Sequence, residues 1–483
     1  MKNKLASNMV YQLLYQSLVV FFPLLTTPIV SRALGSELLG VYSYTYAIAY
    51  YFSLGATLGI STYGSRQIAF NRDNLQKMKS IFWQLYSIQM LCSILVIALY
   101  IAYIILFSKM ELRITWLLQG TTIIMALTDI SWYFTGVEQF KTMVLRNTCI
   151  KLLALVAILC LIHEPMDLNL YIIIMNGTNI IGQLLIWPSA LKIVGSPHFT
   201  LNKFKEHMPY ILRLFLPIMA SNMYVLIDKT VLGCMRTMTE VGYYENSDKL
   251  IKMPIGLASA VSSVLLPRAA YNISHGNREK NNIHVERTLT GVLLFAIPLA
   301  IGLANIAPEL VPWYFGDEYE PCVDFIQAMC PIIIIMIISN ILRLQYYVPN
   351  QKDKEYTYCV VGVSVINFVI NLFTVKSFGV YGIICGTFIG EGIGMLYLMI
   401  KSKKEINYCK IILQISSFFI PAIGMAIGVR RVGDYLGPGI KTNLCQMLTG
   451  CVIYGGILLM ELGIGYLIKG KIKSSDTHKC QER

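Results

Sequence analysis

Long apolar stretches alternate with short polar loops along the whole chain. Each stretch holds about 20 or more mainly apolar residues, enough for an α-helix to cross a hydrocarbon layer of about 30 Å. Such spans are expected at residues 8–32, 39–65, 80–107, 114–135, 143–162, 168–190, 210–235, 241–271, 288–311, 322–347, 355–375, 380–400, 411–429 and 444–468. The pattern therefore predicts an all-α polytopic membrane protein with about 14 transmembrane helices.

The composition agrees with this prediction. Of the 483 residues, 55% are hydrophobic and 14% are charged, whereas a soluble domain carries about 25% charged residues. The net charge of +13 does not predict a nucleic-acid partner, because the positive residues lie at helix ends and not on one soluble surface. The 12 cysteines and six histidines form no CxxC pair and no ligand spacing, so neither a metal centre nor a cofactor is expected.

Positive residues are distributed unevenly between the two sides of the predicted membrane. With both termini inside, 29 of the 40 Lys and Arg residues fall in inner loops or termini and nine near outer ends. The positive-inside rule then predicts that both termini are cytoplasmic. At the N-terminus, Lys2 and Lys4 precede a long apolar segment without a small-residue cleavage site. This predicts a permanent first span in place of a cleaved signal peptide.

Two sequence segments return weakly after about 200 residues. Gly40 and Tyr42 correspond to Gly242 and Tyr244, and residues 132–139 resemble residues 345–351. Such repeats are typical of transporters built from two halves. Because six spans, an even number, separate the copies, both halves should have the same orientation in the membrane. We expect a six-helix lobe at residues 1–197, a second at 198–402, and two additional helices with a basic cytoplasmic tail at 403–483.

The residues around the first two spans resemble a known family. The N-terminal signature of bacterial polysaccharide-repeat-unit flippases of the Wzx type is similar to Thr27-Pro28, Ser31-Arg32, Leu34-Gly35, Gly40, Tyr42-Ser43-Tyr44, Gly59 and Tyr63-Gly64-Ser65-Arg66. Residues 132–139 resemble that family's loop after the fourth span. The resemblance is densest over residues 5–150 and places the chain in the multidrug/oligosaccharidyl-lipid/polysaccharide exporter superfamily.

The resemblance implies a V-shaped core of two six-helix repeats, here with two extra C-terminal helices. It implies a non-enzymatic transporter that flips undecaprenyl-diphosphate-linked oligosaccharides across the bacterial cytoplasmic (inner) membrane by alternating access, for O-antigen or capsule biosynthesis. The implied partners are the lipid-linked glycan, membrane lipid, and polysaccharide polymerase or chain-length proteins. No nucleic acid is expected among them.

Cations inside or beside the spans are the candidates for binding a diphosphate. Lys249 and Lys252 lie three residues apart on one helix face, and Lys229 lies in the preceding span. Intramembrane charges usually face a wet cavity, so these lysines predict a cationic central cavity. The alternative is internal pairing, since Glu245 and Lys249 have the favourable i,i+4 order.

Arginines near the ends of the spans form a second set of binding candidates. They are Arg32, Arg66 and Arg268, of which the last two are related by the repeat. Arg32 can also reach the membrane interface as a long side chain. Arg66 and Arg268 either collect anionic substrate at the cytoplasmic mouth or simply follow the positive-inside rule.

Three carboxylates are candidates for coupling transport to an ion gradient. Asp129 lies in the fourth span, Asp228 in the seventh and Glu391 in the twelfth. Burial raises the pKa of a carboxyl group towards the working pH. The alternatives are an ion pair for Asp228 and a buried hydrogen bond for Glu391, which four glycines flank.

Other functions fit the pattern less well. A drug or cation antiporter of the same superfamily would need a cavity biased to acidic residues. A peptidoglycan-precursor lipid flippase fits the signature less closely than the polysaccharide branch. A membrane enzyme, such as a polysaccharide polymerase or acyltransferase, should show a long external loop or a constellation of His, Asp and Glu, and the sequence has neither.

Overall fold

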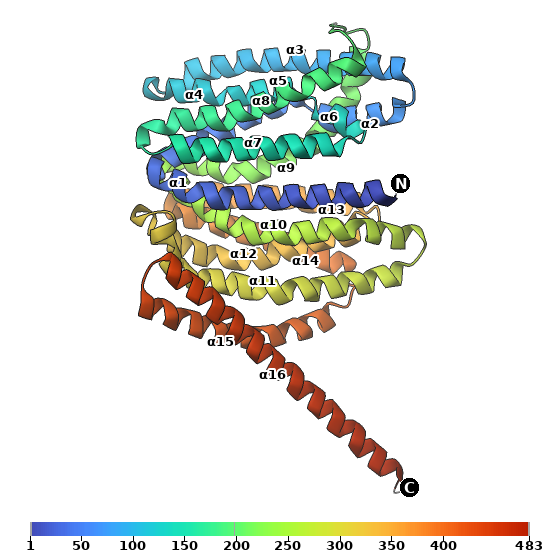
Figure 1. The fold of residues 1–483 in the computed structure, drawn as a ribbon, viewed down its shortest axis with the longest axis vertical. Helices are drawn as coiled ribbons and strands as arrows, with labels where there is room; N and C mark the ends of the chain where they lie inside the picture. Colours follow the sequence, from blue (N-terminus) through green and yellow to red (C-terminus); the bar gives the residue numbers. More distant parts are fainter. Residues whose placement is uncertain (1, 198, 482–483) are drawn as a thin grey trace. The chain divides into compact units, whose positions relative to one another are not determined.

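The computed structural model describes the backbone of residues 2–197 and 199–481, and side chains within residues 22–461 except 140, 198, 217, 220, 221 and 224. These residues are almost entirely helical (Figure 1). The α-helices are α1 (Lys2–Thr57), α2 (Ile60–Asn71), α3 (Leu75–Phe107), α4 (Arg113–Gln119), α5 (Thr121–Thr128), α6 (Ser131–Gly136), α7 (Phe140–Leu161), α8 (Leu168–Val194), α9 (Phe204–Met235), α10 (Met238–Ser274), α11 (Arg278–Tyr314), α12 (Cys322–Leu342), α13 (Asp353–Phe378), α14 (Val380–Ser402), α15 (Tyr408–Leu436) and α16 (Ile440–Gln481).

Four short helical turns complete the secondary structure. Three are 3₁₀ turns, η1 (Met110–Leu112), η2 (Pro165–Asp167) and η3 (Asp317–Tyr319). The fourth, η4 (Arg343–Tyr347), is a π-helical turn that continues α12. Within the described part of the chain, ten helices are long and apolar enough to cross a membrane. The prediction of an all-α polytopic protein is therefore confirmed.

The first two predicted spans, at residues 8–32 and 39–65, are not separated by a loop, because α1 continues from Lys2 to Thr57. Gly35 alone breaks the helical path of α1, with φ 73° and ψ 174°. Glycine adopts this positive φ without the clash that a Cβ would cause. The second predicted span then ends earlier than expected, because Leu58, with φ 47°, separates α1 from α2.

The fourth predicted span is not one helix. The structure divides residues 114–135 into α4, α5 and α6, so the prediction of a continuous helix there is wrong. The larger break follows α5, where Asp129 is extended (φ −74°, ψ 112°). Its Oδ1 accepts a hydrogen bond of 2.8 Å from the backbone N–H of Ser131, which satisfies a donor at the start of α6.

Contacts group the chain into two compact units. Unit 1 comprises Met1–Lys249 and Thr357–Gly390, and unit 2 comprises Leu250–Tyr356 and Glu391–Arg483. In unit 1, α1 contacts α3, α5, α7 and α9, while α3, α4, α5 and α8 pack alongside one another (Figure 1). The six-helix lobes predicted from the repeat stay a prediction.

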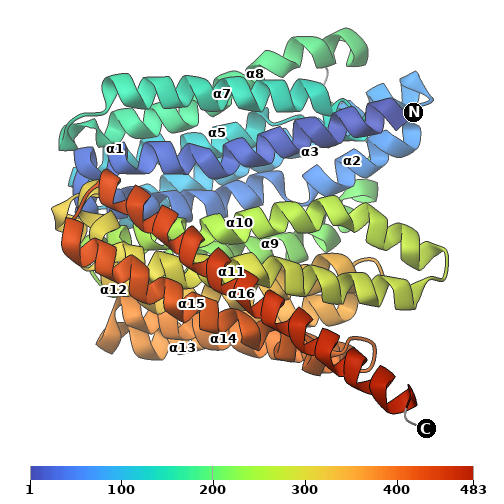
Figure 2. The same cartoon turned by 60° about the horizontal axis from the view of Figure 1, so that its bottom comes forward.

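In unit 2, α15 and α16 pack on α11, and α16 crosses both of its neighbours (Figure 2). The buried carboxylate of Glu309 joins the three helices. Its Oε1 accepts from Arg430 at 3.1 Å, and its Oε2 accepts from Gln446 at 2.9 Å. The two helices that the repeat does not include are thus attached by a buried polar network as well as by apolar contact.

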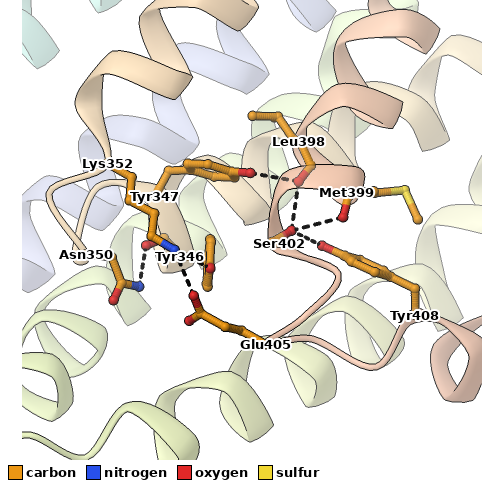
Figure 3. A network of polar contacts seen from close by, with 9 residues as sticks. All are labelled: Tyr346, Tyr347, Asn350, Lys352, Leu398, Met399, Ser402, Glu405 and Tyr408. Carbon is orange, nitrogen blue, oxygen red and sulfur yellow. Dashed lines mark hydrogen bonds and ion pairs between the residues drawn. The ribbon is translucent and has the colours of Figure 1, made fainter.

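A second polar network joins the loop after α12 to the loop after α14 in unit 2 (Figure 3). Lys352 donates to the hydroxyl of Tyr346 at 2.6 Å and pairs with Glu405 at 2.9 Å. The hydroxyl of Tyr347 donates to the carbonyl oxygen of Leu398 at 2.7 Å. The pKa of Glu405 is lowered: burial alone would raise it, but hydrogen bonds from Lys352 and Tyr346 outweigh that effect. These contacts hold the C-terminal ends of both helices together.

The two loops that are related by the weak sequence repeat have the same backbone geometry. Glu138 and Gln351 are the corresponding residues of the two loops, and both adopt a left-handed conformation, with φ 60° and φ 56°. The N–H of each preceding residue bonds to the carbonyl oxygen of Tyr133 and Tyr346 respectively. The N–H groups of Glu138 and Gln351 bond to the carbonyl oxygens of Thr135 and Val348, and those of the next residues bond to Phe134 and Tyr347. Both helices therefore end in the same αL cap.

Candidate functional site

The predicted lysines of unit 1 meet at one carboxylate. Glu245 of α10 pairs with Lys249 one helical turn later, at 3.2 Å, and with Lys229 of α9 through its other oxygen. The carboxylate is buried, whereas the side chains of Lys229 and Lys249 keep 13% and 24% of their surface exposed. The i,i+4 pair was foreseen in the sequence, and the pair between two helices was not.

Two ammonium groups share this carboxylate inside a membrane-spanning region, and the buried Asp248 lies close enough to Lys229 to interact with it electrostatically. Glu245 offsets part of the cost of burying two ammonium groups, since a charge left unpaired in such surroundings costs several kcal/mol. Of the two lysines, Lys249 keeps the larger exposed surface, so it is the more accessible to an anionic group.

A row of tyrosines follows one face of α1 beside the cluster. Tyr42, Tyr46 and Tyr50 are spaced by four residues, and their rings stand 6.1 Å and 5.8 Å apart. Tyr46 lies close enough to Lys229 and Glu245 to interact with them electrostatically. Partly exposed phenol rings offer flat apolar faces and hydroxyl groups, both of which suit the faces and hydroxyls of sugar rings.

Asp228 does not pair with its neighbour Lys229. Its carboxylate accepts hydrogen bonds from Tyr244 at 2.9 Å, Asn371 at 2.8 Å and Thr387 at 3.3 Å. These donors come from α10, α13 and α14, and Asp228 itself is buried. The group is therefore a junction of four helices in unit 1.

The other predicted cations are exposed at separate positions along the chain. Lys252 is exposed one turn further along α10, and Arg32 is exposed in α1. Arg66 is exposed in α2, and Arg268 is exposed in α10. The structure thus brings together Lys229 and Lys249, but it records no shared carboxylate for the arginines within the described side chains.

The two remaining predicted carboxylates occupy different settings. Asp129 caps the start of α6, as described above, and is half-buried. Glu391 is buried in α14. Two of the four glycines that flank Glu391, Gly386 and Gly390, lie close to α13. A Cβ added at either position would meet that helix. Among the described residues, no group of His, Cys, Asp and Glu is arranged to hold a metal ion.

Two charged residues with a structural role were not predicted from the sequence, the half-buried Arg146 and the buried Glu309. Arg146 of α7 donates to Gln183 of α8 at 2.9 Å and to Ser131 at 3.3 Å. Glu309 of α11 binds Arg430, as described above. Both residues could have been found as ionisable positions at the edges of apolar runs. Their partners could not, because those contacts depend on the tertiary packing.

In the part of the chain that the structure describes, ten helices are long and apolar enough to cross a membrane, which is typical of a multi-pass membrane protein. The chain belongs to the polysaccharide biosynthesis protein family, whose family model matches residues 5–272. A family model described as lipid II flippase MurJ matches residues 156–430. The resemblance expected from the sequence is confirmed at the level of this family.

Relatives and solved structures agree with this assignment. The "Putative O-antigen transporter" of Escherichia coli (strain K12) is 21% identical over 383 residues, covering 76% of this chain and 89% of the relative. "Lipid II flippase MurJ" of Bacillus subtilis (strain 168) is 24% identical over 233 residues, covering 46% and 43%.

The structure of "Lipid II flippase MurJ, inward closed conformation" has a TM-score of 0.73 at 17% identity, over 96% of this chain and 100% of that one. An inward-facing multidrug resistance MATE family transporter has a TM-score of 0.61 at 14% identity, over 82% and 95%. At these identities, the structural similarity shows a shared fold.

Proposed function

We propose that this protein flips undecaprenyl-diphosphate-linked oligosaccharide repeat units from the inner to the outer leaflet of the bacterial cytoplasmic membrane. The observation that carries the proposal is the cation-rich cluster of Lys229, Glu245 and Lys249 within the helices of a polysaccharide biosynthesis family member. Both termini are cytoplasmic in this proposal, as the charge distribution of the loops indicates. A polymerase or chain-length protein would take up the product on the outer side.

The substrate class sets the chemical demand. A diphosphate and a hydrated glycan must cross a hydrocarbon layer of about 30 Å, while the polyprenyl chain stays in lipid. Lys249 binds the diphosphate and Lys229 holds Glu245 in place. When the site is empty, Glu245 holds both lysines, so that the anion enters and leaves by exchanging with a carboxylate. Tyr42, Tyr46 and Tyr50 stack on the sugars.

Arg32, Arg66, Arg268 and Lys252 serve the same substrate at other depths in this proposal. Arg66 and Arg268 attract the anionic head group from the cytoplasmic side, and Arg32 assists its release at the outer side. Lys252 extends the cationic face of α10 by one turn. These roles rest on exposure and charge, and each predicts that export depends on the positive charge.

A second candidate substrate is the peptidoglycan-precursor lipid. It is favoured by the family model over residues 156–430 and by the fold shared with a solved lipid II flippase. Both substrates carry a diphosphate on a polyprenyl chain, so the cluster fits either. Complementation separates them, because the protein should restore surface polysaccharide in a flippase-deficient strain but not the viability of a strain depleted of its lipid II flippase.

The site is tested by charge-changing variants in the complemented strain. Lys249→Gln should abolish surface polysaccharide while the protein still accumulates in the membrane, and Lys249→Arg should retain part of it. Lys376→Gln is the matched control, because Lys376 is exposed and lies outside the cluster. Wild-type export by Lys249→Gln would overturn the proposal.

Lys252 needs its own comparison because Asp248 precedes it by one turn. If Lys252→Gln loses export and Asp248→Asn with Lys252→Gln regains it, then Lys252 only neutralises its acid and does not bind substrate. The orientation is tested separately by cysteine labelling. Residue 318 should be accessible from outside and residue 275 protected, and the reverse result would contradict cytoplasmic termini.

A further inference from the structure

Unit 1 contains a pocket of about 830 Å³ where α2, α3 and α9 come together. Residues of the first turns of α3 and α9 line it, including Lys77 and Lys205. Both helices thus begin at the pocket, and a helix N-terminus carries a partial positive charge. None of the residues in the cluster around Glu245 lines this pocket, so it is a separate feature of the molecule.

The pocket is strongly cationic. Lys77, Lys203, Lys205 and Arg213 line it, against the single acidic residue Glu206. Glu206 pairs with Lys203 at 3.2 Å. Within the described side chains, no ion pair involves the other three cations. Arginine and lysine without acidic partners are the groups that bind phosphate, and charge-assisted hydrogen bonds make such binding strong.

The floor of the pocket is a preformed chain of hydrogen bonds between the three helices. His207 of α9 bonds through Nδ1 to the hydroxyl of Tyr63 at 2.9 Å and through Nε2 to Oε1 of Gln84 at 3.0 Å. Nε2 of Gln84 donates to Ser80 at 3.0 Å. Since Gln84 Oε1 can only accept, His207 Nε2 is the donor to it. These bonds fix the floor before any ligand binds, which lowers the ordering cost of binding.

An aromatic pair forms part of the pocket wall. The rings of Tyr63 and Tyr210 lie 6.0 Å apart and almost parallel, at an angle of 6°. Tyr63 is buried, whereas 56% of Tyr210 is exposed. The inner ring therefore supports an outer ring that offers a flat apolar face to a ligand. Sugar rings pack on such faces, and a pocket of a few hundred cubic ångströms accommodates a phosphorylated sugar.

Apolar residues beside the pocket are typical of a membrane surface. Phe70 at the end of α2 and Leu75 at the start of α3 are 80% and 51% exposed. They flank the loop that follows the second predicted span, which the charge distribution assigns to the cytoplasmic side. A ligand in the pocket could therefore keep a lipid tail in the inner leaflet while its polar head group contacts the cations.

We propose that this pocket is a cytoplasmic loading site for the phosphorylated sugar head group of a membrane-bound lipid. This inference rests on the proposed function and adds a binding step before the substrate reaches Lys249. The diphosphate contacts Lys77, Lys205 and Arg213, and the first sugar stacks on Tyr210. The site raises the local concentration of substrate at the entrance and takes no part in crossing the membrane.

Binding is tested with the purified full-length protein and three probes. They are inorganic pyrophosphate, a water-soluble short-chain prenyl-diphosphate N-acetylglucosamine, and vesicles rich in anionic phospholipid. Lys205→Gln with Arg213→Gln should weaken the prenyl-diphosphate sugar by about tenfold or more, as expected for lost charge-assisted hydrogen bonds. Tyr210→Ala should weaken only the probe that carries the sugar. Lys376→Gln is the control and should bind as the wild type.

The probes distinguish the sources of a phosphate ligand. If pyrophosphate binds as tightly as the prenyl-diphosphate sugar, or if Tyr210→Ala has no effect, the pocket binds free phosphate and the proposal is wrong. It is also wrong if the anionic vesicles compete fully with the sugar probe, since the pocket then binds bulk phospholipid. Equal binding by the double variant and the wild type would overturn it as well.

The loading site and the proposed function can fail separately. Lys249→Gln should abolish export but leave probe binding to the pocket unchanged. The pocket variants should raise the substrate concentration needed for half-maximal flipping in liposomes and leave the maximal rate nearly unchanged. If the pocket variants flip with wild-type kinetics while Lys249→Gln is inactive, the loading site is wrong and the flippase function stands.

Discussion

Gly40 of α1 and Gly242 of α10 lie directly against each other and occupy equivalent positions in the internal repeat. A Cβ on Gly40 would collide with the carbonyl oxygen of Met238, and a Cβ on Gly242 would collide with that of Ser36. Ser36 and Met238 are separated by the same number of residues as the two glycines. The contact is therefore reciprocal, as in a pair related by a two-fold axis.

This crossing predicts a sensitive site for substitution. Gly40→Ala or Gly242→Ala should reduce export by about tenfold or more, because the helices must separate or shift to accept the methyl group. Quantitative surface-polysaccharide staining at matched protein levels measures this. Gly177→Ala in α8 is the control, since nothing lies within 4 Å of an added Cβ there. Unchanged export in both glycine variants would show that the close crossing is not needed.

The cluster around Glu245 predicts different outcomes for its three members. Lys249→Gln leaves the pair between Lys229 and Glu245 intact, so the protein should fold and lose export. Glu245→Gln leaves two ammonium groups without their carboxylate, which is costly in such surroundings. It should lower the melting temperature of the detergent-solubilised protein more than Lys249→Gln does. Equal melting temperatures would mean that Glu245 does not neutralise the lysines.

The sequence predicted the fold more completely than the site. Apolar length identifies membrane helices because it follows from the hydrophobic thickness of a bilayer, and the Lys and Arg content of the loops indicates their orientation. The break at Asp129 was missed, since a side chain that bonds to a nearby backbone N–H competes with helix formation in a way that hydropathy does not record. The i,i+4 pair of Glu245 and Lys249 could be predicted from spacing alone.

Contacts between helices could not be predicted in the same way. Nothing in the spacing of α9 and α10 indicates that Lys229 would share the carboxylate of Glu245, or that Asp228 would accept donors from three other helices. The pocket at the start of α9 was missed for the same reason. Its cations were counted only as part of the positive-inside pattern, although the fold gathers them around one hollow.

The three candidate coupling carboxylates give a test of ion dependence. Asp228→Asn should abolish the response of export to collapse of the proton or sodium gradient, because it removes a titratable group at a junction of four helices. Thr387→Val is a matched control that removes one hydrogen bond to Asp228 but keeps the carboxylate. If Asp228→Asn, Asp129→Asn and Glu391→Gln all keep the wild-type gradient dependence, none of these residues couples transport to an ion.

His207 predicts a pH dependence of stability at the start of α9, outside the span predicted at residues 210–235. Burial lowers the pKa of His207. The negative charge of Glu206 opposes this effect, and the positive charge of Lys203 lowers the pKa further. Tyr63 and Gln84 face its two ring nitrogens. The folded protein then binds fewer protons there than the unfolded chain. The contribution of His207 to the stability of the folded protein is therefore full above about pH 6.5, the pKa of an ordinary histidine. It is lost as the pH falls through the lowered pKa of His207.

The measurement is the melting temperature from pH 7.5 to about pH 5, compared between the wild type and His207→Gln. The wild type should lose more stability on acidification than the variant, since glutamine keeps hydrogen-bonding capacity but does not titrate. Parallel pH profiles for the two proteins would show that His207 contributes nothing to the acid sensitivity. The other histidines are unchanged in both and cancel in the difference.

The contacts of Glu309 predict that its buried carboxylate holds α15 and α16 against α11. Its carboxylate is 5% exposed and depends on Arg430 and Gln446 for compensation. Arg430→Met removes the cation and leaves a buried negative charge on Glu309. For a fully buried pair, this loss costs about 3–5 kcal/mol. The cost is lower here because 44% of the Arg430 side chain is exposed. Proteolysis at the turn between α15 and α16 should become faster. The double variant Glu309→Gln with Arg430→Met should recover much of the resistance, because no buried charge is then left unpaired. Asp434, which also pairs with Arg430 at 3.0 Å, has a side chain that is 60% exposed and remains solvated without it. If the double variant is cut as fast as Arg430→Met, the attachment depends on the packing of the arginine side chain and not on its charge.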